Sequence, residues 1–399
     1  MFTFRRQRSA PGSVPAPAPQ QGSGSPPAPA AVPGEAEHFE GPARAPFYLV
    51  SMASYPNFGD ELIARRWLEH LARHRPEDEV WLDVRHPGTA TALFAGIHPR
   101  LRVTDAVFRT VEDSLRGSRR SVEDIVTELG TPLYDAPLLA LREAQSLHLL
   151  GGGFLNAVWP ENDLIVRTLR AASRVSGAPL IATGQGFAPF GQETLEGFDH
   201  VSVRDTPSAD LLGIARGVDD AYLLENLPGR ERSAPPELVL CVQSDAIDVG
   251  AFERLLDFVR RLVEASGVPR ERTRYVEALP GGDHAGYDRL RDLVAEDGFV
   301  PFTQFWRGEF TPAAHQLWIT TRFHHHLVAS LHGARGIALT AKPGYYDVKH
   351  SSLAEGGTGW SISDGTGPVP DLDQLPEPGS AAAAVEAKLA EAHRLYGRN

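Results

Sequence analysis

The chain has 399 residues, a formal net charge of −12 and one cysteine, Cys241. Its 39 Lys and Arg residues against 51 Asp and Glu residues lack the basic surplus of proteins that bind nucleic acids or anionic membranes, which disfavours both kinds of partner. The single cysteine excludes an internal disulfide and a cysteine-rich metal site. No apolar run approaches the ~18 residues of a membrane span, and no apolar stretch follows the N-terminal arginines as in a signal peptide. We therefore expect a cytoplasmic protein.

Residues 1–45 differ in composition from the rest of the chain. They carry nine of the 32 prolines, separated mainly by Ala, Ser and Gly. Such a segment buries too little apolar surface to offset the entropy lost on ordering it. We predict a disordered tail over residues 1–45.

From residue 46 the pattern changes to short apolar runs that alternate with amphipathic stretches. Strands are predicted at 46–52, 79–84, 101–105, 146–153, 179–186 and 200–205. A helix is predicted from about Asp60, since apolar residues such as Leu62 and Trp67 recur at helical spacing. Apolar strands that alternate with amphipathic helices are typical of a parallel sheet covered on both faces. We therefore predict an N-terminal Rossmann-like domain over 46–230.

The alternation starts again after a Pro-rich segment at 228–237, which we interpret as a linker. Strands are predicted at 238–243, 273–279, 299–303, 317–321 and 336–340, and helices at 249–267, 283–296 and 323–333. This pattern predicts a second Rossmann-like domain over 231–372, followed by a C-terminal tail and helix over 373–399. Two such domains form a cleft, and ligands bind just outside the carboxyl ends of parallel strands.

Polar and glycine-rich segments follow five of the predicted strands. They are SYPNFGDE (54–61), GGG (151–153), GQGFAP (184–189), RDTPS (204–208) and RFHHH (322–326). Each has a simpler explanation on its own, because glycines serve tight turns and polar residues start helices. Gly184 and Gly186 lack the third glycine of a dinucleotide fingerprint. The shared position of all five at strand ends predicts that they face one cleft.

Arg322 and His324 stand where a predicted strand gives way to a helix. If Thr320 or Thr321 caps that helix, both side chains lie in its first turn. Cations there oppose the helix dipole by about 0.3–1 kcal/mol each, while the backbone N–H groups attract anions. An anion bound at this point, either a phosphate or a carboxylate, best explains the pattern.

The four histidines between 324 and 332 do not favour a metal site. Helical ligand pairs prefer i, i+4 spacing, and no two of these four are separated by four residues. On a helical wheel His324 has the most inward position, whereas His325 and His326 point elsewhere. We expect no metal and no cofactor, and we assign a functional role to His324.

Six motifs, taken in order, resemble the polysaccharide pyruvyl transferase family over residues 46–353. They are NFGDELI, LLGGGFL, TGQGFAPF, VSVRDTPSADLL, TTRFHHHLVASL and YYDVKHSSL. The resemblance implies an α/β fold like that of GT-B glycosyltransferases, with two Rossmann-like domains of parallel sheets around a cleft. It also implies transfer of the pyruvyl group of phosphoenolpyruvate onto two hydroxyls of a sugar, with release of phosphate. The expected acceptor is a polysaccharide, glycolipid or glycan precursor, with peripheral membrane association left open.

The resemblance also assigns roles to individual residues. The donor-binding residues are Arg204, Arg322 and Lys349. The cleft loops are represented by Asn57, Gly59, Gly152, Gly153 and Gln185. The first domain is the expected acceptor side and the second the expected donor side. From the chemistry of this reaction, His324 is the expected acid or else the residue that holds the leaving phosphate. Asp60 or Asp205 is the expected base for the sugar hydroxyl, with an ion pair to Arg204 as the alternative role of Asp205. The planar fork of arginine suits both the carboxylate and the phosphate of the donor.

Two other functions remain open at this point. A GT-B glycosyltransferase that uses a nucleotide sugar would share the fold, but it usually needs a carboxylate for the ribose, and none is evident after 333–340. A non-catalytic binder of acidic saccharides would need the arginines but no titrating histidine. A pH–activity profile separates this binder from either enzyme.

Overall fold

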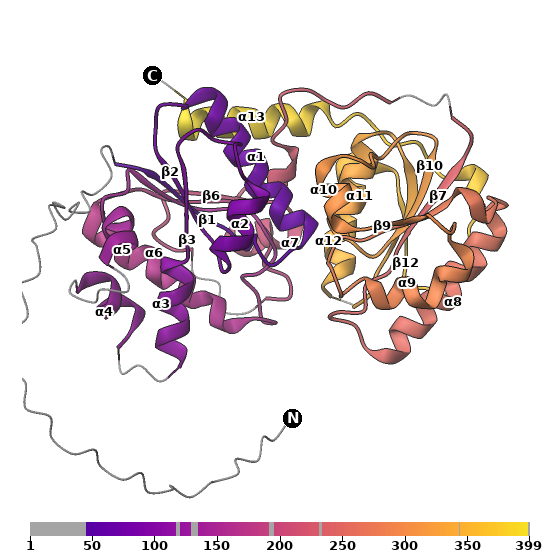
Figure 1. Cartoon of the computed structure of the whole chain (residues 1–399), viewed down its shortest axis with the longest axis horizontal. Coiled ribbons are helices and arrows are strands. Elements are labelled where there is room, and N and C mark those ends of the chain that lie inside the picture. The colour runs from indigo at the N-terminus through magenta and orange to yellow at the C-terminus, as the bar shows by residue number, and fades with distance from the viewer. Residues whose placement is uncertain are drawn as a thin grey trace, which may run out of the picture. The chain divides into compact units, whose positions relative to one another are not determined.

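The computed structural model describes residues 45–116, 120–128, 135–190, 195–230, 234–342 and 344–397 (Figure 1). The tail predicted over residues 1–45 lies outside the described residues except for Ala45. Two parallel six-stranded sheets with their helices make up the described part, which confirms the predicted α/β class. Within these ranges, no helix is both long and apolar enough to cross a membrane.

The first sheet has the strand order β3-β2-β1-β4-β5-β6. Its strands are β1 (Phe47–Val50), β2 (Val80–Asp83), β3 (Leu101–Thr104), β4 (Ser146–Leu149), β5 (Leu180–Gln185) and β6 (His200–Val203). Its helices are α1 (Phe58–His74), α2 (Pro87–Leu93), α3 (Ala106–Leu115), α4 (Val122–Thr127), α5 (Asp135–Arg142), α6 (Asp163–Ser176) and α7 (Thr206–Leu212). Strands β1, β2, β4 and β5 are buried at every position, as expected of strands covered on both faces. We call this sheet with its helices the first lobe.

The second sheet has the order β12-β11-β10-β7-β8-β9. Its strands are β7 (Glu237–Cys241), β8 (Thr273–Val276), β9 (Phe299–Val300), β10 (Gln316–Thr320), β11 (Arg335–Leu339) and β12 (Ser361–Ser363). Its helices are α8 (Val249–Ser266), α9 (His284–Leu290), α10 (Phe302–Arg307), α11 (Phe323–Leu331) and α12 (Tyr346–Leu353). Counted from its own first strand, this second lobe repeats the order of the first sheet.

Both sheets therefore change direction at the same place in their topology. The change occurs between β1 and β4 in the first sheet and between β7 and β10 in the second. Ligands of open α/β sheets bind outside the carboxyl ends of the strands at such switch points. The fold therefore predicts a ligand site at the loops that follow these four strands.

The C-terminal helix α13 (Ala382–Tyr396) returns to the first lobe and lies beside α1 (Figure 1). Lys388 Nζ lies 2.8 Å from Asp220 Oδ1, and both side chains are fully buried. Asp220 Oδ2 in turn accepts from Gly151 N at 2.9 Å and from Trp67 Nε1 at 2.8 Å. The helix therefore supports the glycine-rich loop that follows β4.

The structure corrects some predicted element boundaries. The helix predicted over 283–296 ends at Leu290 and gives way to a 3-10 turn at Arg291–Leu293. The strand predicted over 299–303 consists only of Phe299–Val300, because Pro301 follows and becomes the N-cap of α10. Proline lacks the N–H that a further ladder bond would need.

Candidate active site

A cavity of about 500 Å³ lies at the carboxyl ends of strands from both sheets. The first lobe lines it with residues that follow β1, β2, β4 and β6. The second lobe lines it with residues that follow β7, β8, β10 and β11. The cavity therefore includes both switch points, where this type of fold binds its ligands.

Most of the predicted site residues line this cavity. They are Asn57, Gly59, Asp60, Gly153, Arg204, Arg322, His324 and Lys349. Gly152 and Gln185 are not among the lining residues. Gln185 is fully buried, and its Nε2 donates to Leu150 O at 2.9 Å, so it ties the end of β5 to the end of β4. A Cβ on Gly152 would lie 2.6 Å from the Phe154 ring, which makes this glycine a packing requirement.

Asp219 holds Arg204 and His324 together at one wall of the cavity. Arg204 Nη1 donates to Asp219 Oδ2 at 2.7 Å, and His324 Nε2 lies 3.3 Å from Asp219 Oδ1. Asp219 Oδ1 also accepts from Ala221 N at 2.8 Å, so the backbone fixes the position of the carboxylate. Burial acts to raise the pKa of Asp219, but His324 and Arg204 outweigh it and hold that pKa below its usual value. Asp219 is therefore an ionised carboxylate that orients the Arg204 guanidinium and the His324 imidazole.

Gly59 makes room for the imidazole of His324 at the start of α1. A Cβ on Gly59 would lie 1.8 Å from His324 Nδ1, a separation that no side chain tolerates. The contact joins the first turn of α1 to the first turn of α11. The glycine of the NFGDE loop is thus required by a histidine 265 positions later in the chain.

Lys349 reaches the same wall from α12. Its Nζ lies 3.6 Å from the centroid of the Tyr345 ring. A Cβ on Gly153 would lie 3.2 Å from Lys349 Nζ and 2.8 Å from Arg204 Nη2, so the two cations flank this glycine. No carboxylate of the described ranges forms an ion pair with Lys349. Burial, together with Arg204, lowers the pKa of Lys349 well below its usual value, and Asp60 opposes this shift only in part.

Asp60 faces this group of cations from the first turn of α1. Asn57 Nδ2 donates to Asp60 Oδ2 at 2.7 Å. Burial raises the pKa of Asp60, and His324, Lys349 and Arg204 oppose the shift without cancelling it. A carboxyl group with a raised pKa is suited to exchanging protons closer to neutral pH.

Arg322 pairs with two carboxylates of the second lobe. Its Nε donates to Asp283 Oδ1 at 2.8 Å, and its Nη2 contacts both Asp283 and Asp245. The Asp283 side chain is fully buried, whereas that of Asp245 is 38% exposed and lines the cavity. Asp283 therefore fixes the guanidinium from the interior, and Asp245 pairs with it at the cavity.

The start of α11 differs from the predicted one. Arg322 itself is the N-cap residue, and no side chain caps the helix. Thr320 Oγ1 accepts from Arg322 N at 2.9 Å, and Thr321 Oγ1 accepts from Gln243 N at 2.9 Å. Both threonines therefore stabilise the loops that leave β10 and β7, and His324 still lies in the first turn of the helix.

The helical-wheel assignment of the three consecutive histidines is wrong. His325 and His326 are fully buried, whereas the His324 side chain is 13% exposed at the cavity. His325 packs against aromatic rings including Phe305, and His326 Nε2 lies 2.7 Å from Thr358 Oγ1. A wheel with a single inward face does not describe α11, because this helix is buried on several sides.

Asp205 has a local role in the structure. Its Oδ1 accepts from Ser208 N at 2.9 Å, which makes it the N-cap of α7. The sequence suggested an ion pair between Arg204 and Asp205. In the structure Arg204 pairs with Asp219 instead.

Sequence reasoning missed three carboxylates of the site, Asp219, Asp245 and Asp283. Asp219 and Asp220 form a pair of consecutive acids just before an apolar run (AYLL), and both are buried. Buried carboxylates need cationic partners, so this pair was a usable signal. Asp245 and Asp283 lie in loops with no comparable local pattern.

One protein family matches most of this chain in sequence. The family model described as "Polysaccharide pyruvyl transferase" matches residues 57–343. No curated protein matches the chain in sequence.

The solved structures that match this chain have very low sequence identity to it. A Listeria monocytogenes structure assigned as a UDP-N-acetylglucosamine 2-epimerase is 10% identical with a TM-score of 0.50, over 90% of this chain and 98% of that one. The UDP-GlcNAc 2-epimerase from Neisseria meningitidis is 9% identical with a TM-score of 0.44, over 87% of this chain and 90% of its own. The spinosyn rhamnosyltransferase SpnG is 14% identical with a TM-score of 0.41, over 88% of this chain and 95% of its own. At such identities the likeness to the Listeria structure speaks for the fold alone.

Proposed function

Because the chain belongs to the polysaccharide pyruvyl transferase family, we propose that it transfers the pyruvyl group of phosphoenolpyruvate to two hydroxyls of a sugar. The products of this reaction are a cyclic pyruvate ketal and inorganic phosphate. The observation that carries the proposal is the cationic wall of the cavity, where Lys349 and Arg204 converge on Gly153 and no described carboxylate pairs with Lys349.

The wall formed by Arg204 and Lys349 suits a donor that carries two anionic groups. Burial disfavours the charged form of Lys349, so a bound anion would recover free energy by restoring its proton. Arg322 offers a guanidinium held by Asp283, with the half-exposed Asp245 as an exchangeable partner. Phosphoenolpyruvate carries a carboxylate and a phosphate, and planar guanidinium groups bind both in bidentate fashion. We assign the donor to Arg204, Arg322 and Lys349.

The reaction balances in two additions at one carbon. The first sugar hydroxyl adds to C2 of phosphoenolpyruvate while C3 takes up a proton and becomes a methyl group. The C2–O bond to phosphate then breaks, and the second hydroxyl adds to the oxocarbenium-like centre. Of the two hydroxyl protons, one replaces the proton used at C3 and the other leaves with the phosphate.

His324 is the residue that we assign as the acid. Its Nε2 faces the ionised carboxylate of Asp219, which orients the imidazole at the wall of the cavity. Gly59 fixes the ring on its other side. A positioned acid–base group of this kind contributes about 10²–10⁴-fold to rate.

Asp60 is our candidate for the base that accepts a proton from the sugar hydroxyl. It lies on the first-lobe side of the cavity, and burial raises its pKa toward the range in which a carboxylate competes for hydroxyl protons. Asp205 is engaged in capping α7 and is less available for this role.

The test is direct. The protein is incubated with phosphoenolpyruvate and a panel of nitrophenyl and lipid-linked hexosides, and ketal products are sought by mass spectrometry while released phosphate is measured. UDP-hexoses replace phosphoenolpyruvate in a parallel panel. Phosphate release that depends on a sugar, together with the ketal mass, supports the proposal. Glycosyl transfer from a UDP-hexose, or saccharide binding without turnover of either donor, would overturn it.

A further inference from the structure

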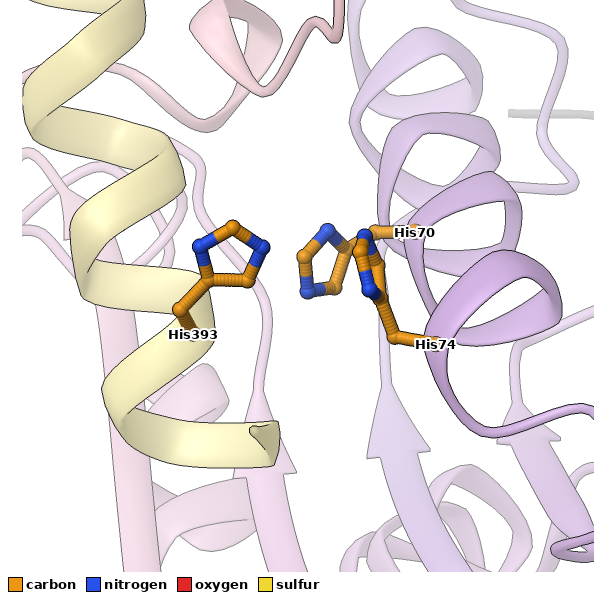
Figure 2. Close-up of side chains that lie close together, drawn as sticks. All are labelled: His70, His74 and His393. Atoms are coloured by element: carbon orange, nitrogen blue, oxygen red, sulfur yellow. The ribbon is translucent and has the colours of Figure 1, made fainter. Parts of the chain in front are cut away.

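Three histidines from distant parts of the sequence meet at the surface between α1 and α13 (Figure 2). His70 and His74 lie one turn apart on α1, and His393 faces them from α13. The ring centroids lie 4.5 Å apart for His70 and His74, 5.4 Å for His70 and His393, and 4.9 Å for His74 and His393. One nitrogen of each ring can be chosen so that all three lie within 4.8 Å of one another.

His70 lacks a hydrogen-bond partner although it is buried. The residue is 3% exposed, and neither Nδ1 nor Nε2 has a partner. The nearest carboxylate oxygen, Glu225 Oε1, lies 3.9 Å from His70 Nδ1. A buried polar group without a partner costs desolvation free energy, and native structures seldom leave one unexplained. An imidazole in this condition, aimed at two others, indicates a ligand that the three rings share.

We propose that His70, His74 and His393 bind one divalent transition-metal ion, with Zn²⁺ as the first candidate, and that this ion fastens α13 to α1. Imidazole is a preferred ligand of zinc, and three protein nitrogens with a fourth oxygen ligand make a common tetrahedral set. The i, i+4 spacing of His70 and His74 places two ligands on one helical face.

The geometry needs only a small adjustment to hold an ion. Zn–N bonds of about 2.0–2.1 Å in a tetrahedral site bring ligand nitrogens to about 3.3 Å from one another. The nitrogens now lie within 4.8 Å. His74 is partly exposed and His393 is exposed, so both rings have room to rotate inward.

Glu225 supplies the negative charge that such a site needs. Its Oε1 lies 3.2 Å from His74 Nε2, and its Oε2 lies 3.0 Å from Arg73 Nη1. The carboxylate can complete the coordination or accept the remaining N–H of His74, which orients a ligating imidazole.

The site is separate from the candidate active site. None of the three histidines lines the cavity at the strand ends. The ion would instead secure α13, whose Lys388 supports the loop after β4 through Asp220. Because the ion binds the folded form, it stabilises the protein by mass action.

The experiment uses the full-length chain without an affinity tag, treated with a chelator and then dialysed. Zinc chloride is titrated by calorimetry, and Co²⁺ reports the ligand geometry by its visible absorption. We expect one Zn²⁺ per chain, intense Co²⁺ bands typical of tetrahedral coordination, and a melting temperature that rises with zinc. His393→Gln should weaken zinc binding by more than about 100-fold, because it removes a ligand. Glu225→Gln should weaken it by about 10–100-fold, the usual cost of losing a residue that orients a ligand.

His393→Gln is the decisive variant, because this side chain is exposed and its replacement should not disturb folding. His74→Gln and the buried His70→Gln should repeat its effect. The matched control is His284→Gln, since His284 is exposed and lies on α9, away from the cluster. Zinc affinity unchanged in His393→Gln, an equal loss in His284→Gln, or no zinc binding by the unmodified chain would each overturn the proposal.

Discussion

The carboxyl edges of the two sheets present different side chains although the sheets share one strand order. The first lobe brings Gly59 and Gly153 to the cavity, whereas the second lobe brings Arg322, His324 and Lys349. The two sets meet, because a side chain on Gly59 would strike His324 and one on Gly153 would crowd Lys349.

The same topology therefore serves two different tasks in a single site. The second lobe supplies long cationic side chains, and the first lobe supplies the space that they occupy. Arg85 and Arg204 are exceptions, since both are first-lobe arginines that line the cavity. The carboxylate partner of Arg204, Asp219, joins it to His324 across the lobes. The predictions below test this division of tasks.

The largest effect is expected for His324→Gln. Loss of a positioned acid should lower turnover by about 10²–10⁴-fold, with little change in stability, because glutamine retains much of the volume. Steady-state kinetics with phosphoenolpyruvate measures this. His332→Gln, at the other end of α11, is the control and should stay active. A fully active His324→Gln enzyme would remove the second lobe's catalytic role.

Gly59→Ala tests the space that the first lobe provides. The new methyl group cannot coexist with the imidazole at 1.8 Å, so His324 must move, and we expect turnover to fall at least tenfold. Alanine favours a helix by about 1 kcal/mol over glycine, so the loss should not come from an unfolded α1. Gly88→Ala in the first turn of α2 is the matched control, because a Cβ there meets nothing within 4 Å. Equal kinetics for both variants would contradict the proposed contact.

Arg322→Lys should weaken binding of phosphoenolpyruvate by about 10–100-fold, the equivalent of one or two charged hydrogen bonds. Lysine keeps the charge but loses the fork that now reaches Asp245 and Asp283 together. Titration calorimetry measures the affinity, with Arg307→Lys at the exposed end of α10 as control. Unchanged affinity would take Arg322 out of the donor site.

Glu61→Gln tests whether the first lobe buries a carboxyl group that keeps its proton near neutral pH. Glu61 is fully buried and accepts from Ser54 N at 2.8 Å, and burial raises its pKa to about 8. The folded protein therefore holds a proton that the unfolded chain, with an ordinary carboxyl pKa, has already lost. Stability should fall as pH rises from about 5 to 8, by at most about 1.4 kcal/mol per pH unit for one proton, and change little above that range.

In Glu61→Gln this component of the pH dependence should be absent. Denaturant titrations at several pH values measure it. Parallel stability curves for the two proteins across this range would show that Glu61 ionises in the folded state as it does in the unfolded one.

The smallest effect is expected on deleting residues 1–45. Their composition offers no core, so the melting temperature and phosphoenolpyruvate affinity should remain the same. A loss of several degrees would mean that this segment contributes to the body of the protein, and the account of the first lobe would then be incomplete.

The sequence predicted the sheets and the cavity better than the contacts within it. The central strands, such as β1 and β7, are mainly apolar and the strand ends carry unusual residues, so the sequence pattern placed Asn57, Arg204 and His324 at one edge. Asp219 could not be assigned in this way, because its partner His324 lies 105 positions away. The helical wheel also failed for α11, since a helix buried on several sides gives no single apolar stripe.

The buried ion pair of Asp220 and Lys388 affects when the first lobe can finish folding during synthesis. The two residues lie 168 positions apart, and Asp220 is made first. A chain emerging from the ribosome completes the first sheet with a carboxylate that still lacks its cationic partner, and such a charge is costly to bury. Domains usually fold as units from the N-terminus during synthesis. We therefore expect the part that is translated first to reach its final packing only after residue 388 has left the ribosome.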